Sequence, residues 1–527
     1  MKWLTPPSVL AAASAALAIG AAMLILRSPP TQAKPTPEAV ADGDREIVWL
    51  YPATNSAAWE RFVASVRRAG TRLRDDPIDA RPEIGAAAFP KETTAVPEVA
   101  LALPGVGRRL VFRWYKLTSD WKTRDWVEAL MRRRPPPLAI VGGSSSDAAR
   151  ELTRQLKDHM GDVAEVDRPL LLLTTATADR VGDTDAGGES HEVDLTKVYP
   201  QRTFRFCFTN RQMAKAVMDF LMSQDDLRPD LNPVHMAQWD DDSYSRDLTD
   251  GFRQALPPWA GLPNPKRITS SVGSFLAPNR FEAEVVDQVL HDLEQTRQHR
   301  PMLAVTGQST PCRRFLAELV RTSPAQARRL LVATGDAVSF NTVYRDRRVT
   351  WPIQELPFPF VFFCHYNPID ADAGFRPEGA APRETEVGGE RDVSTTGTED
   401  ILLDGDIVEA LARALVRDDK PPADAAELSE RIAALRRRHG RVGYDPEGVL
   451  MFGDDGNRTV GAGEHVVCLR PRFRGDRILP EATIEVWVGR GSLHAEEPWR
   501  RRPVDKDGRE TLTVSYEPPV VEEKAGP

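Results

Sequence analysis

The sequence lacks the short motifs that mark many catalytic and cofactor sites. Its 9 histidines form no His-Glu-x-x-His pair, and no Gly-x-Ser-x-Gly turn occurs, so a zinc hydrolase and an α/β-hydrolase are poorly supported. A phosphate-binding loop lysine is missing, and the glycines at 142 and 143 lack the spacing of a dinucleotide fingerprint. We therefore predict a protein that is not an enzyme and that carries no metal and no cofactor.

Cysteine is scarce, and its spacing excludes two more kinds of site. The 4 cysteines are Cys207, Cys312, Cys364 and Cys468, and no two of them form a CxxC pair, so a zinc knuckle or a thioredoxin-type site is not expected. Cys207 and Cys364 lie in apolar, strand-like runs, where a buried free thiol is the expected state. One disulfide is an alternative if the compartment is oxidising.

Neither half of the chain is basic. The 69 Lys and Arg residues are outnumbered by 77 Asp and Glu residues, for a net charge of −8, which argues against nucleic acid as a partner. The 527 residues are 41% hydrophobic, which is ordinary globular usage and enough for large cores in about two to four domains.

The amino-terminal segment is apolar. Val9 to Leu26 contains only apolar or small residues, preceded by Lys2 and followed by Arg27. Residues 1–27 are therefore predicted to be a signal peptide or a membrane anchor, since ~18 apolar residues can just span a bilayer. We favour the anchor, because Thr31-Gln32-Ala33 is a poor cleavage site. In both cases the rest of the chain is expected to be periplasmic or otherwise extracytoplasmic.

Strand-like and helix-like segments alternate through most of the sequence, which predicts parallel α/β sheets. No period of about 20 to 50 residues repeats, so a solenoid is not expected. We divide the chain into a linker (28–44), a first lobe (45–200), a second lobe (201–365), a flexible loop (366–398), helices and closing strands that return to the lobes (399–498), with a small β extension, and a flexible tail (499–527). The proline-rich residues 75 to 107 are expected to be irregular.

The most informative stretch is residues 138 to 150. An apolar run from Leu138 to Val141 is followed by two glycines, by Ser144, Ser145 and Ser146, and by a helical pattern. Glycine permits a sharp turn, and serine is a good N-cap. The free amides of a helix start, together with the hydroxyls, suit a small anion such as a carboxylate. The alternative is a capped turn that binds nothing.

Small polar residues follow other predicted strands in the same way. They are Thr174 to Thr177, Asp240 to Tyr244, Gly307 to Ser309 (which includes Gln308) and Asp336. Ligands of open α/β sheets bind at the carboxyl ends of the strands, so a cleft between the lobes is the default site. Asp240 to Asp242 suits a divalent cation by its carboxylates, although a helix-capping turn is the preferred interpretation.

Four sequence features together resemble the type I periplasmic binding proteins, specifically the branched-chain amino acid receptors of ABC transporters. They are Ile140-Val141-Gly142-Gly143-Ser144-Ser145-Ser146-Asp147-Ala148-Ala149, the strand ending in Thr174 to Thr177, Thr203-Phe204-Arg205-Phe206, and the glycine-rich stretch of Gly440, Gly443 and Gly448 through Met451-Phe452-Gly453-Asp454-Asp455-Gly456-Asn457-Arg458. In the family, the third feature opens the second lobe, and the fourth is a closing hairpin. The resemblance covers about residues 45 to 470.

The resemblance implies a two-lobe fold that closes on a ligand by a hinge, without catalysis. It implies that the ligand carboxylate meets Ser144, Ser145, Ser146, Thr175 and Thr177, and that Tyr244 faces the ligand. The family usually has glycine after that tyrosine, where this chain has Ser245. Asp336 is a candidate by its chemistry for the acid that receives a ligand ammonium. Gln308 follows a strand end, and Trp59 lies one turn inside the helix after the first loop; both complete the predicted site.

We therefore predict an exported solute-binding protein that takes a small polar or carboxylated, amino acid-like ligand for an ABC transporter permease or for sensing. Its partners would be the ligand, the permease and, through the N-terminal segment, the membrane. The alternative is a non-catalytic interaction or structural module that kept the fold and lost the ligand. The inserts at 75 to 107 and 370 to 398 favour that alternative.

Overall fold

The computed structural model describes residues 34–75, 78–184, 190–274, 277–338, 356–366, 398–417, 421–435, 437–439, 448–450, 452–459, 464–475, 477–489, 499–501 and 512–515. The predicted signal or anchor (1–27), Gly440, Gly443 and Met451 lie outside these residues, as do most of the predicted loop 366–398 and of the tail 499–527. Within the described ranges, no helix is both long and apolar enough to cross a membrane.

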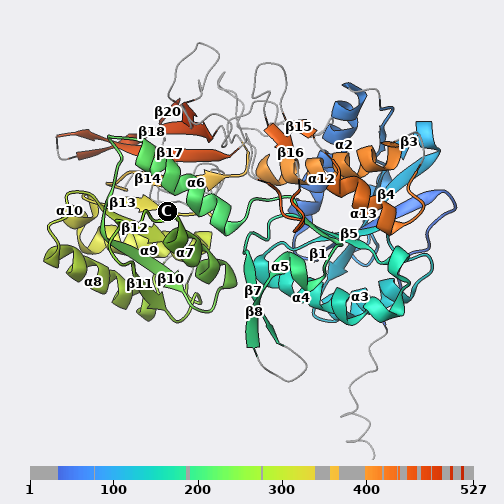
Figure 1. Cartoon of the computed structure of the whole chain (residues 1–527), viewed down its shortest axis with the longest axis horizontal. Helices are drawn as coiled ribbons and strands as arrows, with labels where there is room; N and C mark the ends of the chain where they lie inside the picture. The colour runs from blue at the N-terminus through green and yellow to red at the C-terminus, as the bar shows by residue number, and fades with distance from the viewer. Residues whose placement is uncertain are drawn as a thin grey trace, which may run out of the picture.

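The first lobe is built on a seven-stranded sheet, at the right of Figure 1. Its strands, in spatial order, are β2 (Arg81–Glu83), β3 (Glu98–Leu103), β4 (Arg108–Leu117), β1 (Asp44–Pro52), β5 (Ala139–Gly142), β6 (Leu170–Leu173) and β9 (Thr203–Arg205). The pairs from β4 to β9 are parallel, whereas β2 and β3 run antiparallel to their neighbours. A separate hairpin is formed by β7 (Arg180–Thr184) and β8 (Ser190–Asp194).

The helices of this lobe cover both faces of its sheet (Figure 1). They are α2 (Ser56–Asp75), α3 (Thr123–Arg132), α4 (Ser146–Asp158), α5 (Leu195–Val198), α12 (Thr398–Val416) and α13 (Ala425–Ala433), with short 3₁₀ turns η1 (Ala86–Ala88), η2 (Pro104–Val106), η3 (Met160–Asp162) and η4 (Glu165–Asp167). Alternate residues of β1 explain the layering, because side chains of a strand point to opposite faces. Trp49 packs in the core with α2 and α12, and Val48 packs in the core with α3 and α4.

The second lobe contains a nine-stranded sheet, at the left of Figure 1. Its strands are β11 (Asn264–Ile268), β10 (Asp230–Trp239), β12 (Pro301–Val305), β13 (Leu331–Ala333), β14 (Phe360–Cys364), β17 (His465–Arg474), β18 (Arg477–Gly489) and β19 (Trp499–Arg501), with β20 (Leu512–Ser515) also paired to β18. From β11 to β14 the pairs are parallel, and the C-terminal strands are added antiparallel to β14. A two-stranded sheet is formed by β15 (Arg437–His439) and β16 (Gly448–Leu450).

Among the residues that the structure describes, five helices flank this second sheet. They are α6 (Asn210–Ser223), α7 (Ser243–Ala255), α8 (Arg280–Gln295), α9 (Ser309–Thr322) and α10 (Pro324–Ala327). Met236 of β10 packs in the core with α6 and α7, and the next residue, Ala237, packs in the core with α8 and α9. Each lobe therefore has a sheet buried on both faces, which is why its parallel strands read as continuous apolar runs.

The fold class expected from the sequence is confirmed, but two details differ. Residues 75 to 107 are not wholly irregular, because Glu98–Leu103 is an antiparallel strand with four of its six residues buried. The Thr203–Arg205 strand was expected to open the second lobe; instead it pairs with β6 and is the last strand of the first sheet. The chain passes between the lobes after β9, after β14 and before β17.

Candidate functional site

The serine loop follows β5 and begins α4. Gly143 has a φ of +80°, and a Cβ there would lie 2.9 Å from Leu173, so the turn requires glycine. Ser145 is the N-cap of α4, and its Oγ accepts a hydrogen bond from the amide of Ala148 at 3.2 Å. Ser144 and Ser145 are exposed, whereas Ser146 is buried and accepts from the amide of Ala178 at 3.2 Å.

The threonines after β6 differ in their surroundings. Thr174 is buried, and its hydroxyl lies 2.6 Å from that of Tyr51. Thr175 is partly exposed. Thr177 is 1% exposed, and its hydroxyl has no hydrogen-bond partner within the part of the chain that the structure describes. The carbonyl of Thr177 accepts from the guanidinium of Arg205 at 3.2 Å, so this loop is fixed to the end of β9.

In the second lobe, Asp336 lies after β13 between the side chains of Tyr244 and His365. The hydroxyl of Tyr244 donates to its Oδ1 at 3.0 Å, and Nε2 of His365 lies 2.9 Å from its Oδ2. Nδ1 of His365 accepts from the amide of Phe208 at 3.3 Å, so Nε2 is the nitrogen that carries the proton in the neutral ring. Tyr244 and His365 therefore orient the two oxygens of the Asp336 carboxylate.

Burial of this cluster has an electrostatic consequence. The Tyr244 side chain is 4% exposed, and its hydroxyl also accepts from the amide of Ala337 at 3.2 Å. Burial, followed by the negative charge of Asp336, raises the pKa of Tyr244 well above its usual range. Tyr244 therefore stays a neutral hydrogen-bond donor to Asp336. The Tyr244 hydroxyl can lie this close to the backbone because residue 335 is a glycine. A Cβ at Gly335 would lie 2.6 Å from that hydroxyl.

The three acids at positions 240 to 242 turn to three different partners. Asp242 is the N-cap of α7 and accepts from the amide of Tyr244 at 3.0 Å. Burial is the main cause that raises its pKa, and a hydrogen bond from the side chain of Gln308 partly opposes that effect. Asp240 accepts from Gln238 at 2.7 Å. The capping interpretation thus describes Asp242, and exposed Gln308 is placed beside it.

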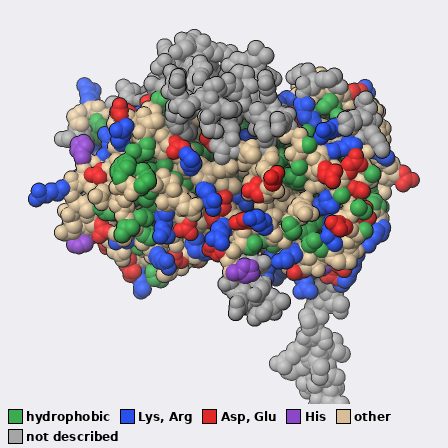
Figure 2. All heavy atoms as spheres, viewed as in Figure 1, with side chains coloured by type: hydrophobic (Ala, Val, Ile, Leu, Met, Phe, Trp, Pro, Cys, Tyr) green, Lys and Arg blue, Asp and Glu red, His purple; other side chains and the backbone are tan. Residues whose placement is uncertain are grey.

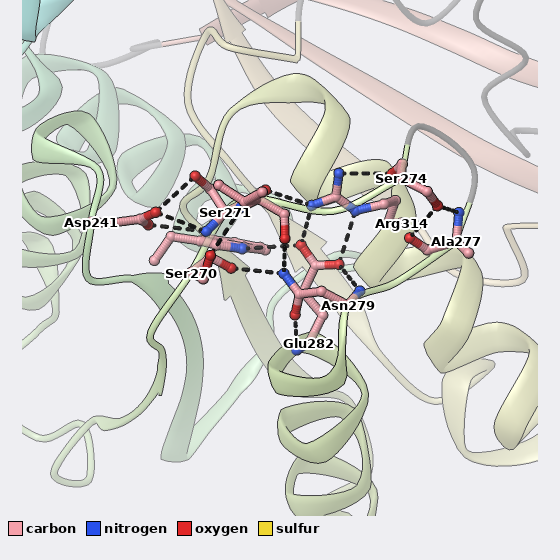
Figure 3. Close-up of polar contacts among 10 residues, drawn as sticks. Asp241, Ser270, Ser271, Ser274, Ala277, Asn279, Glu282 and Arg314 are labelled. Carbon is pink, nitrogen blue, oxygen red and sulfur yellow. Dashed lines mark hydrogen bonds and ion pairs between the residues drawn. The ribbon is translucent and has the colours of Figure 1, made fainter. Parts of the chain in front are cut away.

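Asp241 faces a separate polar cluster on the second lobe (Figure 3). It accepts from the amide of Ser271 at 2.9 Å and from the Ser271 hydroxyl at 3.0 Å. The loop that carries Ser271 is also held by Arg314, which donates to the Ser271 carbonyl at 2.8 Å and forms a buried ion pair with Glu282. Asp241 therefore stabilises the loop that carries Ser271.

Trp59 is not part of this arrangement. Its side chain is 2% exposed, and its indole N–H donates to the carbonyl of Ala88 at 2.8 Å. The ring packs against Trp49, Phe62 and Trp114 with centroid distances of 5.4 to 6.0 Å. The structure therefore assigns Trp59 to the core of the first lobe, and the expectation that it faces a ligand is corrected.

The sequence-based prediction omitted His365 and Arg205. His365 directly follows the buried strand β14, so the rule that polar residues at strand ends form the site applies to it as well. Arg205 is fully buried at the end of β9 and donates to the carbonyls of Thr177 and Ala178. Arg205 lies in the stretch Thr203 to Phe206 that carries the family resemblance, but its bonds to carbonyls 28 and 27 positions away are not evident from local sequence.

Comparison with known proteins identifies the fold. No family model matches the sequence, and no curated protein matches it. An ABC transporter substrate-binding protein from Desulfitobacterium hafniense, in complex with Leu, has a TM-score of 0.50 at 12% identity, over 82% of this chain and 99% of that one. A leucine-binding protein from Thermotoga maritima has a TM-score of 0.48 at 13% identity, over 82% and 97%.

A solute-binding protein of an ABC transporter from R. palustris, in complex with 4-hydroxybenzoate, has a TM-score of 0.48 at 9% identity, over 83% of this chain and 95% of that one. At such low identities the likeness shows the fold alone. The chain has the two-lobe fold of the type I periplasmic binding proteins, and its structural neighbours are ABC transporter substrate-binding proteins.

Proposed function

We propose that this chain is an exported, non-catalytic solute-binding protein that holds a small ligand between its lobes, for an ABC transporter permease or for sensing. The ligand would carry a carboxylate toward Ser145 and Thr175 of the first lobe and a cationic group toward Asp336 of the second. The observation that carries the proposal is the Asp336 carboxylate, held by Tyr244 and His365 and only partly exposed.

The chemistry of the two lobe edges supports this assignment. A carboxylate that is largely removed from water and held by a tyrosine hydroxyl and a histidine ring favours a cationic partner. On the other lobe, Ser144 and Ser145 are exposed at the start of α4, where amides and the helix dipole favour an anion. A molecule with both charges, such as an amino acid, matches both edges. The structural neighbours in complex with Leu and with 4-hydroxybenzoate support carboxylated ligands as the class to test.

The test is a thermal-unfolding screen of the full chain against amino acids and aromatic carboxylates. A ligand that binds only the folded state adds RT ln(1 + [L]/Kd) to stability, ~2.7 kcal/mol at a hundredfold excess over Kd. We expect at least one compound to raise the melting temperature, and we expect Ser145→Ala with Thr175→Ala to remove that rise. A matched control is Thr71→Ala with Ser223→Ala, whose hydroxyls bond carbonyls of their own helices.

The second candidate is an interaction module without a ligand. It is favoured by the strands β17 to β20, which extend the second sheet beyond β14. This candidate predicts that no compound stabilises the chain and that the Ser145 and Thr175 substitutions change only the intrinsic melting temperature. Loss of the Ser145 cap alone costs about 1 kcal/mol, so the ligand-induced shift, and not the melting temperature itself, is the quantity to compare.

A further inference from the structure

One face of α7 contacts the first lobe directly. Ser243 and Asp247 lie four residues apart on this helix, so they share a face. The Ser243 hydroxyl donates to Oδ1 of Asp147 at 2.7 Å, and Asp147 lies in the first turn of α4. On the face shown in Figure 2, acidic and basic side chains are intermixed along the junction of the lobes.

Asp247 makes the more extensive of the two contacts. Its Oδ2 accepts from the amide of Asp179 at 2.8 Å, and its Oδ1 accepts from the amide of Arg180 at 3.0 Å. Asp179 directly precedes β7 of the first lobe, and Arg180 is the first residue of that strand. The side-chain amide of Asn210, which is fully buried, donates to Oδ2 at 2.9 Å and fixes the orientation of the carboxylate.

A side chain of the first lobe makes a similar contact with the second lobe. The Asp179 carboxylate accepts from the amide of Arg211, in the first turn of α6, at 2.9 Å. Asp179 thus bonds one helix of the second lobe through its side chain and another through its backbone. Two carboxylates, one from each lobe, each accept backbone amides of the opposite lobe.

We propose that Asp247 is a positioning residue that ties the two lobes together and thereby sets how far the protein favours its closed arrangement. The ratio of open to closed forms depends on the difference in free energy between them. Hydrogen bonds that form only when the lobes meet contribute to that difference. The consequence for ligand affinity rests on the proposed function, because a ligand held by both lobes binds tighter when closure costs less. The tie itself does not require a ligand.

The surroundings of Asp247 agree with this role. Burial and the neighbouring Asp179 raise the pKa of Asp247 to about 6, so it is a carboxylate at neutral pH. Hydrogen bonds from backbone amides to a carboxylate are stronger than those between neutral groups. The hollow beside the tie is lined by other charged residues, namely Arg180, Glu192, Arg211, Arg246 and Asp250.

The experiment measures the separation of the lobes in the full chain with no ligand added. Spin labels at Arg124→Cys on α3 and Gln288→Cys on α8 report the interlobe distance, because both positions are exposed and the four described native cysteines are buried. We expect Asp247→Ala to shift the distribution toward longer distances, with a change of about tenfold in the ratio of open to closed forms. Asp247→Asn preserves the shape of the side chain and is measured in parallel, in case the alanine variant does not fold.

The matched control is Asp250→Ala, since Asp250 is exposed on the same helix and pairs with Arg253 of that helix at 3.2 Å. Its distance distribution is expected to equal that of the unsubstituted chain. Identical distributions for the Asp247 variants and the unsubstituted chain overturn the tie, even if a ligand is found. If the Asp247 variants show longer distances but no compound stabilises the chain, Asp247 joins the lobes as proposed. The proposed ligand function is then rejected.

Discussion

Arg458 donates to the carbonyl oxygen of Phe206 at 3.1 Å, and this bond joins two of the three places where the described part of the chain passes between the lobes. The same guanidinium nitrogen lies 3.2 Å from the hydroxyl of Tyr366, which follows β14, the last strand before the second passage. The guanidinium also lies over the ring of Phe208 at 4.4 Å. Arg458 therefore joins described residues next to each of these passages between the lobes.

Substitution of Arg458 is expected to weaken this junction. Its side chain is buried, and Arg458→Ala would leave the Phe206 carbonyl and the Tyr366 hydroxyl without this donor. We expect a loss of ~2–4 kcal/mol in the free energy of unfolding, measured by urea denaturation. Arg253→Ala, at an exposed helix position, is the control and is expected to change stability little. Equal effects of the two substitutions would contradict the assigned role.

Gly456 is expected to tolerate no side chain. It has a φ of +74°, and a Cβ there would lie 2.1 Å from the carbonyl oxygen of Thr203. Gly456→Ala should therefore cost more than the ~1–2 kcal/mol of left-handed backbone alone, because β9 must also move. Gly475→Ala is the matched control, since Gly475 has a φ of +62° with open space around it. Thermal melts of the two variants that agree within error would refute the close contact at Gly456.

Glu464 is expected to make stability fall as pH rises. Burial, followed by the negative charge of Asp219, raises its pKa from 4.5 to about 8. Between these two values the folded state keeps a proton that the unfolded state has lost, so the free energy of unfolding decreases with increasing pH. Glu464→Gln mimics the neutral acid and should be the more stable protein at about pH 8, with the difference vanishing near pH 4.5.

The control for this titration is Glu60→Gln, because Glu60 is exposed on α2. Its stability should follow that of the unsubstituted chain across the same pH range. If Glu464→Gln also follows the unsubstituted chain, Glu464 is not a buried acid with a raised pKa.

Substitution of Trp59 distinguishes a role in the core from a role in ligand binding. Trp59→Ala should cost ~3–5 kcal/mol, since it empties a fully packed aromatic cluster. The milder Trp59→Phe keeps much of the packing, loses the hydrogen bond to Ala88, and should leave ligand-induced stabilisation unchanged. A ligand shift that disappears in Trp59→Phe would restore Trp59 to the binding site.

The sequence predicted the parts of the site that depend on local pattern. The turn at Gly143, a helix cap within Ser144 to Asp147 and a capping turn at Asp240 to Asp242 follow from residues within a few positions of one another, and the structure identifies Ser145 and Asp242 as the caps. The two-lobe α/β class followed from alternating apolar runs and helical patterns, which are also local.

The remaining features depend on contacts that are distant in sequence. The His365–Asp336 pair spans 29 positions, and Arg458 reaches a carbonyl 252 positions away. Nor does local sequence decide to which sheet a three-residue strand such as Thr203–Arg205 is added. Trp59 was misassigned because an aromatic residue near a helix start has the same spacing whether it faces a core or a ligand.

Calorimetric titration of the full chain shows whether Asp336 holds the cationic group of a ligand. The titrant is the compound that stabilises the chain most in the screen, and the variant is Asp336→Asn, with exposed Asp287→Asn as the control. We expect about ten- to hundredfold weaker binding to Asp336→Asn and unchanged binding to the control. Equal affinity for Asp336→Asn and the unsubstituted chain, or a screen in which no compound binds, would contradict this role of Asp336.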